Sequence, residues 1–295
     1  MVGPDVLGWQ PHPDVWLMLL VLVGGYLYAL SAWGRTHAPG GRPASRRQIG
    51  LFLLGAFALW LASDWPVHGY DEVLFSVHMV QHLLYAFVAA PLLILGTPAW
   101  LFRRLLRPRV VGAVVSRLTR PLVALVVFNG WMLLYHTPLF VNWSVHSPAF
   151  HFATHVVWVL AGVVMWWPVL SPLPELPHIS SYFVRMGYLF AQTIIPSIPA
   201  SFFTFARTPF YETYAAATQL VGVDAVDDQQ LAGLIMKLGA GAILWTVIGV
   251  LFYRWLQDEE HGEPDPLYWR DLEPEVTAVQ RHEEGGDHGS GGDGR

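Results

Sequence analysis

The sequence contains no cysteine among its 295 residues. That absence excludes disulfide bonds and any metal site built on thiolates. Charged residues are also scarce, at 13% of the chain, whereas soluble domains carry about 25%. Hydrophobic residues make up 54%. This composition excludes an ordinary soluble domain and indicates a protein that crosses a membrane several times.

Familiar catalytic patterns are absent as well. The sequence shows no nucleophile–base–acid arrangement, no phosphate-binding loop and no nucleotide motif, so we do not expect an enzyme. The net charge of −5 says little about partners, because the acidic residues are concentrated in the C-terminal segment.

Several apolar stretches reach the length of about 20 helical residues that a bilayer requires. Such stretches form helices in lipid, where every backbone polar group must be paired within the protein. We therefore expect an all-α fold, a polytopic membrane helix bundle with seven transmembrane helices. The expected spans are approximately 15–33, 49–66, 76–101, 121–141, 149–170, 182–206 and 230–256.

The chain is expected to divide into two regions. Residues 1–257 would form the seven-helix transmembrane domain. Residues 258–295 are acidic and rich in glycine, a composition typical of disorder, and would form a largely disordered cytoplasmic tail.

The arginines predict the orientation of these spans. The N-terminal segment and the second and fourth loops contain neither Lys nor Arg. Because basic loops stay in the cytoplasm, the first and third loops are expected to be cytoplasmic, with the N-terminus outside and the C-terminus inside. The arginines of these two loops are Arg35, Arg42, Arg46, Arg47, Arg103, Arg104, Arg107, Arg109, Arg117 and Arg120.

Two pairs of histidines stand one helical turn apart at the start of spans. The third span begins with "HMVQH", which contains His78 and His82, and the fifth begins with "HFATH", which contains His151 and His155. Residues four apart share one helix face. Both spans would start outside, and His136 would end the fourth span there. Imidazoles from three helices are therefore expected at one level near the outer surface.

Neutral imidazole is a ligand for copper, zinc and iron, so this arrangement predicts a metal site. The alternative is a set of interfacial histidines that bind loops and lipid headgroups. Met236 could supply a soft ligand for copper, or it could be a core residue. Asp64 could bind the metal or orient a histidine, or it could simply cap a helix. The expected metal ligands are His78, His82, His151, His155, His136, Met236 and Asp64.

Three segments resemble the CtaG-type (caa3-type) cytochrome c oxidase assembly factors, a family of seven-span bacterial membrane proteins. They are "HMVQHLLYAFVAAPLLILGTP" (78–98), "HFATHVVWVLAGVVMWWPVL" (151–170) and "DQQLAGLIM" (228–236). The resemblance covers nearly all of residues 10–257 but not the acidic tail. The four paired histidines and Met236 match positions in these segments.

This resemblance implies an assembly factor for a heme–copper cytochrome c oxidase that binds or delivers copper at the external membrane face. It implies a multi-pass protein of the bacterial plasma (inner) membrane, part of the respiratory chain. Oxidase subunits or a periplasmic copper donor would be its partners besides the lipid bilayer, and no nucleic acid is expected.

Two other functions stay open at this stage. One is a heme-binding membrane oxidoreductase that uses histidines as axial ligands. The other is a metal-free scaffold for oxidase subunits. Histidine pairs one turn apart suit a small ion better than a porphyrin, whose two axial ligands approach from opposite sides.

Overall fold

The computed structural model describes residues 8–261, and these residues form helices and connecting turns without a strand. The expected all-α fold class is confirmed for this part of the chain. Most of the expected tail, residues 262–295, lies outside the described residues. The chain divides into two compact units at Gly249 and Val250. The second unit contributes only the end of the last helix to the described residues.

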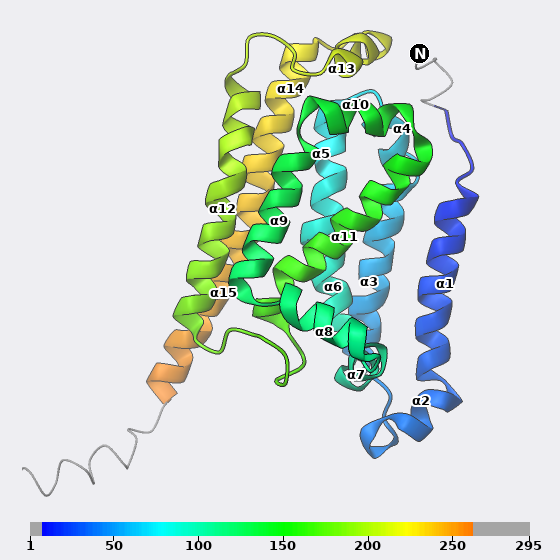
Figure 1. Cartoon of the computed structure of the whole chain (residues 1–295), viewed down its shortest axis with the longest axis vertical. Coiled ribbons are helices and arrows are strands. Elements are labelled where there is room, and N and C mark those ends of the chain that lie inside the picture. The colour runs from blue at the N-terminus through cyan, green and yellow to red at the C-terminus, as the bar shows by residue number, and fades with distance from the viewer. Residues whose placement is uncertain (1–7, 262–295) are drawn as a thin grey trace, which may run out of the picture. The chain divides into compact units, whose positions relative to one another are not determined.

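Seven long helical segments, five uninterrupted and two composite, run through the described residues and are joined by short helices and turns (Figure 1). The uninterrupted helices are α1 (Pro13–Leu30), α3 (Arg46–Ser63), α9 (Pro121–Tyr135), α11 (Pro148–Leu170) and α12 (Tyr182–Phe205). The short connecting helices are α2 (Ala32–His37), η2 (Pro39–Gly41), α4 (Val67–Asp71), α7 (Ala99–Leu105), α8 (Arg109–Leu118), α10 (Pro138–His146), α13 (Glu212–Ala217) and η4 (Thr218–Val221).

Two of the long segments contain a π-helical turn. Helix α5 (Phe75–Leu83) continues through the π segment η3 (Leu84–Ala89) into α6 (Ala90–Gly96). Helix α14 (Ala225–Leu234) continues through the π segment η5 (Ile235–Gly239) into α15 (Ala240–His261), which runs on into the second unit. A π turn inside an α-helix is uncommon and often occurs at a functional site.

Four helices in the described part of the chain are long and apolar enough to cross a membrane. Helices α8 and α9 would add a fifth if this pair, bent by 83°, counts as one span. A helix is present in each of the seven expected ranges, but length and composition support four or five spans. The four are Pro13–Leu30, Phe75–Gly96, Ala149–Leu170 and Ala225–Glu260.

Close helix packing holds the two histidine-bearing helices together. Helix α11 packs against η3 and α6, the continuation of α5. A Cβ atom on Gly162 of α11 would lie 2.7 Å from the Cα atom of Ala86, so only glycine allows this approach. The indole Nε1 of Trp166 donates a hydrogen bond to the Ala86 carbonyl at 3.0 Å. The spacing between the two histidine pairs therefore depends on backbone contact between α11 and η3.

The two ends of the first unit differ in character (Figure 1). Helices α4, α10 and α13 lie at one end, whereas α2, α7 and α8 lie at the other. The histidine pairs begin α5 and α11 at the first end, and arginines occupy the three short helices at the second. The two histidine pairs thus lie at the end opposite the arginines of these short helices, as the loop pattern predicted.

Candidate metal centre

The start of α5 is fixed by a residue from a distant part of the sequence. Leu74, at the N-cap of α5, makes no side-chain cap. Instead, the carboxylate of Asp228 on α14 accepts hydrogen bonds from the backbone N–H groups of Phe75 and Ser76, at 2.7 and 3.2 Å. It also accepts one from the Ser76 hydroxyl. This buried cap sets the position of His78, which stands in the first turn of α5.

The short helix α4 places a buried carboxylate beside α5. Asp71 ends α4 and has an exposed fraction of 0%. The hydroxyl of Tyr214 donates to its backbone carbonyl at 3.0 Å, which anchors this end of α4. Neither carboxylate oxygen of Asp71 has a hydrogen-bond partner among the described residues. Burial of a carboxylate costs several kcal/mol unless a cation or hydrogen bonds compensate it.

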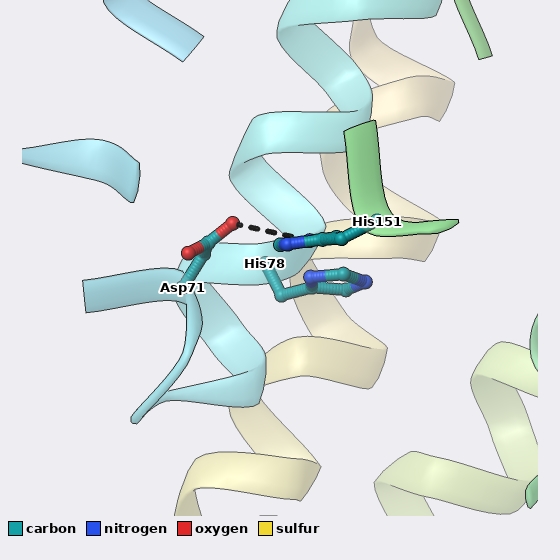
Figure 2. A group of neighbouring side chains, drawn as sticks. All are labelled: Asp71, His78 and His151. Carbon is teal, nitrogen blue, oxygen red and sulfur yellow. Dashed lines mark ion pairs between the residues drawn. The ribbon is translucent and has the colours of Figure 1, made fainter. Parts of the chain in front are cut away.

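Asp71, His78 and His151 form one compact group of buried side chains (Figure 2). Each offers a ligand atom, and these atoms all lie within 4.8 Å of one another. Nε2 of His151 lies 3.9 Å from Oδ2 of Asp71. The rings of His78 and His151 stack, with centroids 6.3 Å apart, and both nitrogens of His78 are buried without a partner. Two imidazoles and one carboxylate at these distances could hold a metal ion.

A third histidine contacts the same carboxylate. Nδ1 of His68, in α4, lies 3.5 Å from Oδ1 of Asp71. Burial lowers the pKa of His68, but the contact with Asp71 and the charges of Asp71, Glu72 and Asp14 together raise it by more, to about 9. Burial likewise raises the pKa of Asp71, yet the contact with His68 lowers it below the usual range. In the metal-free protein, a proton on His68 therefore partly balances the charge of Asp71.

The second member of each histidine pair lies next to the first. The rings of His78 and His82 have centroids 4.2 Å apart, and so do those of His151 and His155. Nδ1 of His155 contacts the Tyr85 hydroxyl at 3.2 Å. The ring of His136 lies 5.9 Å from that of His82. All five predicted histidines are buried.

The imidazoles thus lie one beside the next in a row, and they do not all surround a single position that one metal ion could occupy. Of the five predicted histidines, His78 and His151 are the two that group with Asp71. His82 and His136 contact each other farther along α5 and α9. Met236 lines a small cavity with these two residues and does not join the group around Asp71.

Asp64 is engaged elsewhere. One of its carboxylate oxygens, Oδ2, accepts hydrogen bonds from the indole groups of Trp16 and Trp60, at 2.7 and 3.0 Å. The other oxygen accepts one from the backbone N–H of Trp65 at 2.7 Å. These contacts tie α1 to the end of α3. The structure therefore places Asp71, not Asp64, among the histidines.

A cavity of about 430 Å³ leads to this group. Its apolar wall is contributed by α1, α3 and α11, and one end is polar. His12 precedes α1, and its ring lies 4.6 Å from that of His68, which continues the row of histidines into the cavity. The polar end comprises His12, Asp14, His68, Glu72, His151 and His155.

Three residues of this centre were not predicted from the sequence: Asp71, His68 and His12. A signal was present for Asp71. It stands in a loop without Lys or Arg that lies next to the "HMVQH" segment. A carboxylate with no basic neighbour in its own loop has only the histidines, or a metal, as a source of positive charge.

Comparison with known proteins agrees with the earlier family resemblance. The chain is 27% identical over 241 residues to the uncharacterized protein ML1998 of Mycobacterium leprae, covering 70% of this chain and 34% of that protein. It is 28% identical over 204 residues to the uncharacterized protein Mb0105 of Mycobacterium bovis, covering 58% of this chain and 30% of that one. The chain thus spans about a third of the length of these curated relatives. No solved structure matches it.

A match to a family model covers most of the chain. Residues 24–258 match the cytochrome c oxidase caa3 assembly factor (Caa3_CtaG) family. The matched residues include α3 and every helix that carries the histidine pairs, Asp71 and Met236. The chain belongs to the cytochrome c oxidase caa3 assembly factor family.

Proposed function

We propose that this protein assists the assembly of a heme–copper cytochrome c oxidase by holding copper at Asp71, His78 and His151. Membership in the family supports a role in oxidase assembly, and the buried carboxylate and imidazoles support metal binding. Imidazole binds copper well, and a carboxylate lowers the net charge of a site that holds Cu²⁺. The protein would act by binding and handing on an ion rather than by turning over a substrate.

The observation that carries this proposal is the environment of Asp71. Its carboxylate is fully buried, and its oxygens lack hydrogen-bond partners. Both nitrogens of His78 lack partners too. Leaving such groups unsatisfied costs about 1–3 kcal/mol each, and more for a charge. One metal ion among these three side chains would satisfy the carboxylate and the imidazoles together.

The arginines indicate which side of the membrane the copper centre would face. The end of the bundle with α2, α7 and α8 carries Arg35, Arg103, Arg104 and Arg117 and would face the cytoplasm. The copper centre, at the opposite end, would then face the outside of the bacterial plasma membrane. With seven spans, the N-terminus lies outside and the C-terminus inside.

The partners follow from the same arrangement. A periplasmic copper donor would reach the centre through the cavity at α1, α3 and α11. An oxidase subunit would receive the ion or be held during its insertion. A metal-free scaffold for oxidase subunits and a heme protein are the competing functions.

Elemental analysis tests the proposal directly. The full-length protein is purified in detergent from copper-supplemented cells as wild type, as Asp71→Asn with His151→Ala, and as the control His178→Ala. His178 is exposed, and Nδ1 of its ring lies 2.9 Å from the carbonyl oxygen of Leu176, not beside Asp71. We expect the double variant to lose one copper equivalent and to restore oxidase activity poorly in cells that lack the protein. The control should match the wild type.

Three outcomes would overturn this function. A double variant without copper that fully restores the oxidase would favour the scaffold. A Soret band in the purified wild type would favour heme. Wild-type protein that takes up no copper would remove the basis for a copper centre.

A further inference from the structure

A second cavity lies one helical turn along α5 from His78. It has a volume of about 30 Å³, which is enough for one ion or one small molecule. Residues of α5, α9 and η5 line it, together with Trp158 and Pro196. Three of the chain's seven methionines line this cavity with two histidines. These five side chains, named here the Met/His pocket, are Met79, His82, Met132, His136 and Met236.

The imidazoles of the Met/His pocket have nitrogens without partners. Nδ1 of His136 lies 2.7 Å from the carbonyl of Met132, so it carries the proton and donates it. Nε2 of His136 is therefore the unprotonated nitrogen, and it is buried without a partner. Both nitrogens of His82 are buried without a partner as well. The indole of Trp158 stacks on the ring of His82 at 4.2 Å and fixes its plane.

Packing by itself does not explain this composition. Methionine often fills gaps in a core, which would suffice for the thioethers of Met79 and Met132, each 2% exposed. A core built only for packing would not include two histidines with unpaired nitrogens. A water molecule needs about two to four polar partners, and thioethers are poor acceptors. The pocket combines thioethers, which soft cations prefer, with imidazoles, which also bind copper.

The backbone is also unusual around the Met/His pocket. The π segment η3 begins directly after Leu83, and η5 contains Met236. Both π segments thus adjoin the same cavity. A Cβ atom on Gly239 of η5 would lie 2.6 Å from Cδ1 of Leu83, so η5 approaches α5 closely here. Met236, inside η5, lines the cavity together with His82 and His136, and π turns are frequent at functional sites.

We propose that the Met/His pocket is a separate site for monovalent copper. Thioether ligands select Cu⁺ over harder divalent ions, and imidazole also binds copper, whereas a centre with a carboxylate suits Cu²⁺ or Zn²⁺. The two histidines of "HMVQH" then serve different sites: His78 belongs to the Asp71 centre and His82 to the Met/His pocket. Their rings are 4.2 Å apart, so the two sites are adjacent. The choice of copper as the metal rests on the proposed function, but the ligands of the Met/His pocket are not those of the Asp71 centre.

Silver provides a soft, redox-inert probe for this pocket. Ag⁺ is titrated into the purified full-length protein whose Asp71 centre is saturated with Zn²⁺. The test variant is Met132→Leu with Met236→Leu, which conserves volume. The control is Met165→Leu, a methionine that is 0% exposed and does not line the cavity. We expect the double variant to weaken Ag⁺ binding about tenfold or more and to leave Zn²⁺ binding unchanged, while the control changes neither.

Two further measurements make the result independent of variant folding. Wild-type protein labelled with selenomethionine and loaded with Cu⁺ is examined at the selenium absorption edge, and we expect copper as a direct neighbour of selenium. Asp71→Asn should weaken Zn²⁺ binding but not Ag⁺ binding. Absence of a copper–selenium contact, or Ag⁺ displaced one for one by Zn²⁺, would overturn the second site. A wild-type protein that binds Ag⁺ but not Zn²⁺ would contradict the Asp71 centre and would still support the Met/His pocket.

Discussion

Asp228 and Phe75 are 153 positions apart, yet the carboxylate of Asp228 accepts a hydrogen bond from the Phe75 backbone N–H at 2.7 Å. The same carboxylate accepts from the N–H and the hydroxyl of Ser76. An acidic residue of one helix therefore caps the helix that carries His78. These hydrogen bonds fix the first turn of α5 against α14 at the end of the bundle that carries the histidine pairs.

Replacement of Asp228 by alanine should destabilise the protein by about 2–4 kcal/mol, because buried N–H donors at the start of α5 would lose their acceptor. Asp227→Ala is the control, since Asp227 is exposed in the same helix turn and should cost less than about 1 kcal/mol. Thermal unfolding in detergent measures both. Equal effects of the two variants would contradict the capping role.

Asp71→Asn should separate stability from metal binding. The amide removes the charge that pairs with His68. Because one partner of the pair is then left unpaired, the metal-free variant should be less stable than the wild type, and the effect of metal is measured from that lower baseline. Metal at 100 times its dissociation constant should stabilise the wild type by about 2.7 kcal/mol and the variant much less. Glu72→Gln, at the half-buried neighbouring position, is the control and should retain that stabilisation. A metal-induced shift in Asp71→Asn as large as that of the wild type would contradict the assigned ligand.

Gly162→Ala should disturb the contact between the two histidine-bearing helices. The added Cβ atom would lie 2.7 Å from the Cα atom and 2.9 Å from the carbonyl oxygen of Ala86, and backbone atoms cannot move aside cheaply. Overpacking of this kind costs about 1–3 kcal/mol. Gly130→Ala is the matched control, because a Cβ atom there meets nothing within 4 Å. The control should be neutral or stabilising by up to about 1 kcal/mol.

Gln192→Leu should have a moderate effect on stability. Gln192 accepts a hydrogen bond from Asn129 at 2.6 Å and donates one to Tyr188 at 3.0 Å, which links α12 to α9. Hydrogen bonds between helices in lipid contribute about 0.6 kcal/mol on average, so the loss should be about 1–2 kcal/mol. Thr193→Val serves as the control, since the Thr193 hydroxyl bonds only within α12. A loss above about 4 kcal/mol would point to a further role for this network.

Local patterns were sufficient for several features of the fold. Continuous apolar stretches predicted the helical class, which the structure confirms for the described residues. The spacing of His78 and His82, and of His151 and His155, predicted that each pair shares a face, because an α-helix has about 3.6 residues per turn. In both pairs the rings are neighbours.

The carboxylate of the centre could not be selected in this way. Asp64 lies at the end of the second expected span and Asp71 stands seven positions later in the loop that follows, so both are near histidines in the sequence. Two tryptophan indoles from α1 and α3 bind Asp64, whereas helix α4 turns Asp71 toward His151. Only the packing of α1, α4 and α11 distinguishes the two acids.

The amino-acid sequence alone determined that this chain is a helical membrane protein with histidine pairs at one end and arginines at the other. Periodicity and hydrophobicity are local properties, and the bilayer imposes helices on apolar stretches. The tertiary structure decided which of those histidines meet Asp71 and which meet the methionines. Such contacts join side chains from helices far apart in the chain, and their distances depend on backbone approaches such as Gly162 to Ala86.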